Sequence, residues 1–154
     1  MTLLYALMLF LHLSSAAFWV GGMATMHFAV RPAAVATLEP PQRLPLLCLA
    51  LRRFFAWVGM AIVLLLVSGF SMIAIAGGFA RVHWSVHLML LLGLVMVALF
   101  WMIRFSLWPK LAAHVAEAQW PAAAARLDVI RKLVLLNLGL GVLVFFVAIV
   151  GRAL

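Results

Sequence analysis

The sequence contains few charged residues and almost no acidic ones. Lysine, arginine, aspartate and glutamate make up 9% of its 154 residues, and only 3 residues are acidic. Soluble domains have about 25% charged residues, so this chain lacks the polar surface of a soluble fold. Its one cysteine, Cys48, excludes an intramolecular disulfide and a multi-cysteine metal site. We expect Cys48 to be a small buried side chain.

Hydrophobic residues, in contrast, account for 69% of the chain, and its mean hydropathy is +1.29. Both values predict an integral membrane protein of a single domain. Four apolar stretches reach the roughly 20 residues that cross a bilayer, and they cover 3–30, 54–80, 83–107 and 130–151. We therefore expect an all-α four-helix bundle, as a multi-pass protein of a bacterial-type inner membrane.

The basic residues lie between these stretches and not in one patch. Nine of the 11 fall in segments 31–53 and 104–132, which lie on the same side of the predicted bundle. The positive-inside rule places that side in the cytoplasm and both termini on the outer, periplasmic side. It explains the positive net charge without nucleic acid as a partner.

Local signals suggest how these two segments fold. Pro40, Pro41 and Pro45 are expected to interrupt the first segment. The stretch QWPAAAARLDVIRK, residues 119–132, is expected to form a short helix lying along the membrane surface.

Two histidines lie inside predicted spans at comparable depth. His12 interrupts the apolar run LHLSSAAFWVGG, roughly 14 Å below the outer end of the first span, and His87 lies about 9 Å below the outer end of the third. Ionisable side chains within a span usually face the bundle interior and are functional. We therefore expect the two rings to face each other in the outer half of the bundle.

Other residues surround this predicted pair. Met8 and Trp19 share one helical face with His12. Ser68 and Gly69 of the second span lie at the same depth, where small residues allow close approach of a helix or a flat ligand. Asn137, in the fourth span, is expected to form a hydrogen bond between helices.

These residues are compatible with three interpretations. The first is one haem b between spans 1 and 3, with His12 and His87 as axial ligands and with Arg81 and Arg152 paired to the propionates. Electron transfer with a quinone, a porphyrin or a redox partner protein would follow.

The second interpretation is copper. Soft thioether and imidazole ligands suit Cu(I), and Met8 and Met89 lie near His12 and His87 in the sequence. His83, one turn before His87, is an alternative metal ligand on the third span. The third interpretation has no cofactor: both rings form hydrogen bonds with serine, tyrosine or a backbone carbonyl.

The stretches LHLSSAAFWVGGM, HWSVHLMLLLGLVM and IRKLVLLNLGLG resemble the CopD-like family of small four-span bacterial membrane proteins. This resemblance implies movement of copper across the inner membrane. The same superfamily includes HemJ-type protoporphyrinogen oxidases. The resemblance to that branch implies haem binding at His12 and His87. That branch has a lysine where this chain has Met89, so the question whether this chain is an oxidase stays open. Membrane lipid is the expected partner, and a homodimer stays open.

Overall fold

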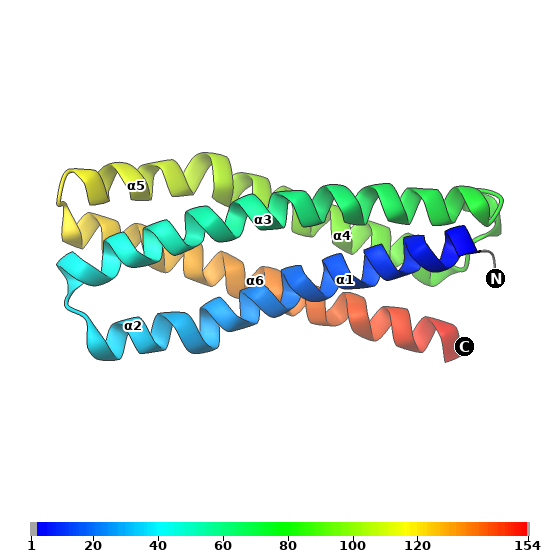
Figure 1. The fold of residues 1–154 in the computed structure, drawn as a ribbon, viewed down its shortest axis with the longest axis horizontal. Helices are drawn as coiled ribbons and strands as arrows, with labels where there is room; N and C mark the ends of the chain where they lie inside the picture. The colour runs from blue at the N-terminus through cyan, green and yellow to red at the C-terminus, as the bar shows by residue number, and fades with distance from the viewer. Residues whose placement is uncertain (1–2, 154) are drawn as a thin grey trace.

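The fold is an elongated bundle in which the chain runs back and forth four times (Figure 1). The structure is a computed structural model that describes residues 3–153, without the side chains of residues 152 and 153. The described residues contain helices and no β-strand. Four helical stretches are long and apolar enough to cross a membrane: Leu3–Thr37, Pro40–Ile75, Trp84–Ala116 and Trp120–Gly151. The predicted all-α four-helix membrane architecture is confirmed.

Two of these stretches contain a change of helix type. The first consists of α1 (Leu3–Thr25), a π-helical turn (Met26–Val30) and α2 (Arg31–Thr37). The third consists of α4 (Trp84–Met102), a π-helical turn (Ile103–Leu107) and α5 (Trp108–Ala116). The second and fourth are α3 (Pro40–Ile75) and α6 (Trp120–Ala153), and a 3-10 turn (Phe79–Arg81) precedes α4.

Both π-helical turns have the same local cause. Pro32 and Pro109 each lie two residues after such a turn. A proline has no backbone N–H to donate, and its ring crowds the carbonyl four residues earlier. A turn with wider hydrogen bonding relieves this conflict, so the helix continues past the proline.

The helices extend beyond the predicted spans on the side of the basic segments. Pro40 and Pro41 do not interrupt a loop, since they occupy the first turn of α3, where a backbone N–H has no helical partner to lose. Pro45 lies inside the same helix. The separate surface helix expected over 119–132 is also wrong, because α6 runs without a break from Trp120. Repeated alanines, the strongest helix formers, favour that continuity.

The middle of the bundle is closely packed. α1 lies along α3, and α4 lies along α6. Trp19 of α1 and Phe55 of α3 both place their rings edge-on to Phe100 of α4, at centroid distances of 6.4 and 5.9 Å. Gly141 lets α6 approach α1, since a Cβ at this position would lie 2.6 Å from a methyl group of Val20.

Two predictions about single side chains are confirmed in this core. Cys48 is buried, and the amide nitrogen of Asn137 donates a hydrogen bond from α6 to the backbone carbonyl of Met96 on α4, at 3.4 Å. This polar contact holds α4 and α6 together inside the apolar interior.

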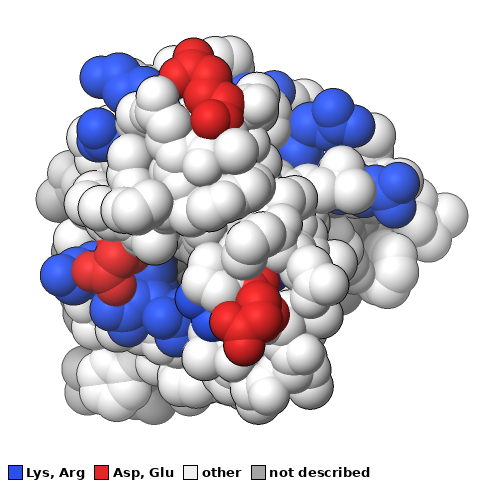
Figure 2. All heavy atoms as spheres, turned by 90° about the vertical axis from the view of Figure 1, so that its left-hand side faces the viewer, with Lys and Arg blue, Asp and Glu red and all other residues white. Residues whose placement is uncertain are grey.

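Charge is concentrated at the end of the bundle opposite the termini. Figure 2 views the end where α2 turns into α3 and α5 turns into α6, and both basic and acidic side chains gather on it. The termini lie together at the other end (Figure 1), as an even number of crossings requires. Which end faces the cytoplasm stays a prediction from the positive-inside rule.

Candidate functional site

A cavity of about 700 Å³ lies in the half of the bundle that carries the termini. α1, α3, α4 and α6 all contribute to its wall. The connection between α3 and α4 crosses this end through Gly77 and Gly78, both with φ of +94°, a conformation that glycine adopts without steric cost. The size is typical of sites for small molecules and cofactors, which run from about 300 to 1,000 Å³.

The cavity wall is apolar apart from a few side chains. Four polar residues line the part of the wall that the structure describes: Tyr5, His12, His83 and Ser85. Polar groups this sparse, converging on an apolar space, usually orient a ligand and provide specificity. Their geometry therefore decides which ligand the cavity suits.

His12 has a defined tautomer. Its Nδ1 lies 3.1 Å from the carbonyl oxygen of Leu65 and 3.2 Å from the hydroxyl oxygen of Ser68. The Ser68 hydroxyl donates its only hydrogen to the carbonyl of Leu64, at 2.6 Å. Both neighbours of Nδ1 therefore act as acceptors, and Nδ1 must carry the ring proton.

This tautomer leaves Nε2 of His12 with an unshared electron pair. All the hydrogen bonds that the structure describes for the ring fall on Nδ1. Histidines that bind metals are held in the same way, because one ring nitrogen donates to a carbonyl and the other faces the metal. The third interpretation, a histidine satisfied by serine and a carbonyl, accounts for Nδ1 but leaves Nε2 without a role.

The residues predicted near His12 lie beside it. Ser68 is 1% exposed. A Cβ at Gly69 would lie 3.2 Å from Cε1 of His12, so the glycine lets the imidazole pack directly on α3. Trp19 is 4% exposed, lines the cavity and packs on Phe100. Their part in binding a cofactor stays a prediction.

The third span places its histidines differently from the expectation. His83 lines the cavity, and its Nδ1 accepts a hydrogen bond from the backbone N–H of Ser85 at the start of α4. His87 is exposed, does not belong to the described cavity wall, and packs its ring 6.0 Å from that of Phe79. The cavity therefore brings His12 together with His83 and not with His87.

His87 does not line the cavity because its side chain lies on another face of α4, although its depth along the helix was as expected. The cavity-lining face of α4 passes through Val86, Met89 and Gly93. His87 follows Val86, so it is rotated by about 100° from it around the helix axis. The predicted depth of His87 did not specify where its side chain points.

The methionines also differ from the expectation. Met89 lines the cavity, whereas Met8 is not part of its described wall. Met72 and Met96, which were not predicted as ligands, do line it. Helical spacing could have indicated both, since Met72 lies one turn after Ser68 and Met96 two turns after Met89.

Arg81, one of the two predicted propionate partners, does not belong to the described cavity wall. Arg81 is exposed, and its side chain folds over Gly77, where a Cβ would lie 2.8 Å from its Cδ. Arg152 belongs to the last turn of α6, and its side chain lies outside the described residues. Pairing of these arginines with propionates stays a prediction.

A family model described as "Copper resistance protein D", CopD, matches residues 48–150. The match covers most of α3 and all of α4, α5 and nearly all of α6, so it includes Ser68, Gly69, His83 and Met89 but not His12. No curated protein matches, and no solved structure matches.

Proposed function

This chain belongs to the CopD family of copper resistance proteins, and from that premise we propose that it binds copper in the cavity between its four helices. It is a multi-pass membrane protein, and in this proposal copper is the substrate that it takes up or passes on. The observation that carries the proposal is the ring of His12, which lines the cavity and has all of its described hydrogen bonds on Nδ1, so that Nε2 is left to bind a ligand.

The other cavity residues favour Cu(I) over harder cations. Across the described residues, no three or more His, Cys, Asp or Glu side chains gather into a metal site. Met72, Met89 and Met96 line the same cavity as His12. Thioethers and imidazoles are neutral, soft ligands that suit Cu(I), and they bring no further charge into the membrane interior.

His83 provides a route to this site. It is exposed and yet lines the cavity, and it lies where the chain enters α4 at the end of the bundle. A copper ion arriving from that side would meet His83 first and His12 deeper in the cavity. In this proposal the two imidazoles act in succession.

Haem b is the second candidate, and the size of the cavity favours it. About 700 Å³ of mostly apolar space exceeds what a bare ion requires and falls in the range of cofactor sites. His12 Nε2 would supply one axial ligand. A second axial ligand from the described wall would be His83 and not His87, and electron transfer with a quinone or porphyrin would be the corresponding activity.

One experiment separates the two candidates. The protein is expressed with ample copper and haem precursor, purified in detergent, and examined by metal analysis and by absorption before and after dithionite. We expect a colourless protein that holds Cu(I) against a competing chelator such as bicinchoninate. A stoichiometric Soret band with resolved α and β bands on reduction would instead establish haem. Absence of both copper and haem would contradict both candidates.

Ser68 is a positioning residue in this proposal. Replacing Ser68 by alanine removes one of the two acceptors that hold Nδ1 of His12 but leaves the Leu65 carbonyl in place. Loss of such supporting contacts costs about 10- to 100-fold in metal affinity, so we expect a decrease of about tenfold in Cu(I) affinity by chelator competition.

Ser71 offers the matched control for Ser68. It lies on the same helix and donates to the carbonyl of Val67 at 2.7 Å, but it has no described hydrogen bond to His12. Ser71→Ala should leave the affinity unchanged. Equal affinities for Ser68→Ala and the unmodified protein would show that the carbonyl alone orients the ring.

A further inference from the structure

A second, shallow groove lies near the charged end of the bundle. It runs between the first helical stretch and α6, and α3 forms its floor. Two kinds of residue line it. The basic ones are His27, Arg31 and Arg131, and the apolar ones are Met26, Leu47, Leu51, Leu127, Ile130 and Val134.

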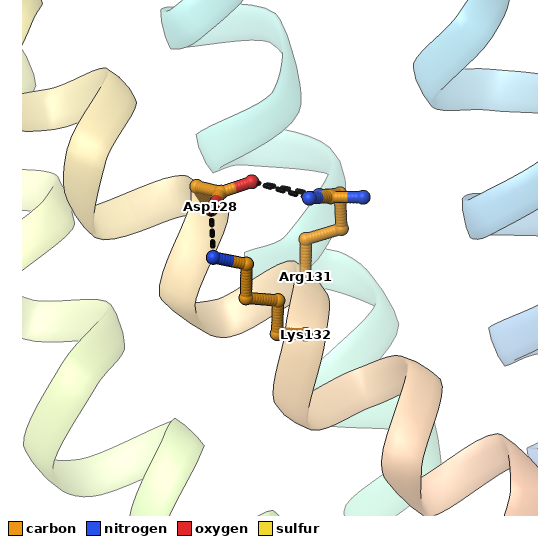
Figure 3. A network of polar contacts seen from close by, with 3 residues as sticks. All are labelled: Asp128, Arg131 and Lys132. Atoms are coloured by element: carbon orange, nitrogen blue, oxygen red, sulfur yellow. Dashed lines mark hydrogen bonds and ion pairs between the residues drawn. The ribbon is translucent and has the colours of Figure 1, made fainter.

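The basic side chains of this groove are only partly neutralised. Asp128 accepts hydrogen bonds from Arg131 at 2.6 and 2.9 Å and pairs with Lys132 at 2.9 Å (Figure 3). One carboxylate thus serves two cations. Arg31 is half-buried and has no ion pair or hydrogen bond among the described side chains. The groove therefore keeps an excess of positive charge.

The groove also lies where apolar helix surface gives way to charge. His27 and Arg31 are one turn apart on the first helical stretch, so they face the same side. Phe28 beside them is 67% exposed, as expected for a side chain in contact with lipid. A ligand here would meet cations at one end and apolar side chains at the other.

We propose that this groove binds the phosphate headgroup of an anionic membrane phospholipid. Arg31 and Arg131 contact the phosphate, and the apolar residues contact the glycerol and the beginning of the acyl chains. Basic pockets between membrane helices recognise anionic lipids in this way. The site is remote from the copper cavity and does not depend on it.

The headgroup is anionic and not zwitterionic because the described lining of the groove contains no carboxylate and the nearby Asp128 is already paired. A choline or ethanolamine ammonium would need a negative partner, and both oxygens of Asp128 already bind Arg131 and Lys132. Phosphatidylglycerol and cardiolipin carry net negative charge without an ammonium group. They therefore match the charges of the groove better than phosphatidylcholine does.

The test is thermal unfolding of the full chain in detergent with added lipid. We expect phosphatidylglycerol to raise Tm, and phosphatidylcholine or inorganic phosphate at the same concentration to leave it unchanged. Arg31→Gln should weaken phosphatidylglycerol binding about fivefold, the effect of one basic residue at an anionic surface. Arg31→Lys, which keeps the charge, should retain most of the binding even if Arg31→Gln folds poorly.

Arg53 provides the control. It is exposed on α3 and does not line the groove, so Arg53→Gln should leave the lipid-induced shift intact. Equal losses in Arg31→Gln and Arg53→Gln would mean that general charge attraction, and no site, holds the lipid. An equal shift with phosphatidylcholine, or a full shift with phosphate alone, would also overturn the proposal.

Discussion

Replacing His12 by alanine is expected to lower the affinity for Cu(I) by more than about 100-fold, since loss of residues that only orient a metal ligand already costs 10- to 100-fold. His12 is the cavity residue whose ring has one nitrogen held by α3 and the other available. Competition with bicinchoninate on the purified protein measures the change. His27→Ala and His114→Ala, at the opposite end of the bundle, should bind copper as the unmodified protein does.

His83 and His87 test whether the cavity geometry or the depth along the span identifies the copper ligand. His83 lines the cavity and His87 does not, so His83→Ala should weaken copper binding and His87→Ala should not. The reverse result would restore the pairing of His12 with His87. An unchanged affinity in His12→Ala would remove the basis of the copper proposal at this cavity.

The largest effect on stability is expected for Trp19→Ala. Its side chain is 4% exposed, lines the cavity and packs edge-on to Phe100. Truncation of a buried tryptophan costs about 3–5 kcal/mol in soluble proteins. In a bilayer the unfolded helices stay in lipid and only packing is lost, so we expect the lower end, about 3 kcal/mol.

Unfolding by increasing SDS in mixed micelles measures this loss, and Trp57 gives the control. Trp57 is 60% exposed on α3, so Trp57→Ala should change the free energy of unfolding by no more than about 0.5 kcal/mol. Similar losses for both variants would contradict the view that burial of Trp19 against Phe100 accounts for the loss.

Composition and hydropathy were sufficient to predict the architecture because a bilayer allows few kinds of backbone structure. Backbone groups inside lipid must form their own hydrogen bonds, so long apolar stretches become helices. The helix ends were less predictable. Pro40 and the segment from Trp120 look like interruptions, but Pro40 falls at a helix start and the alanines after Trp120 continue α6.

The candidate site was predicted in part. Depth along each span follows from residue number and the helical rise, which correctly placed Ser68 and Gly69 beside His12. The direction of a side chain follows from how each helix is rotated against its neighbours, which periodicity leaves open in a span that is apolar all round. α4 is such a span, and this is why His87 was preferred to the alternative ligand His83 and why Met96 was not predicted.

The sequence by itself therefore determined that the chain forms a four-helix membrane bundle, that its two basic segments lie on the same side, and how deep His12 lies in its span. All three depend only on hydrophobicity and position along the chain. Only the tertiary structure decided which residues meet. The tautomer of His12 depends on the Leu65 carbonyl and on Ser68, which are more than 50 residues away in the chain. The cavity depends on four helices separating at one end while Trp19, Phe55 and Phe100 pack in the middle.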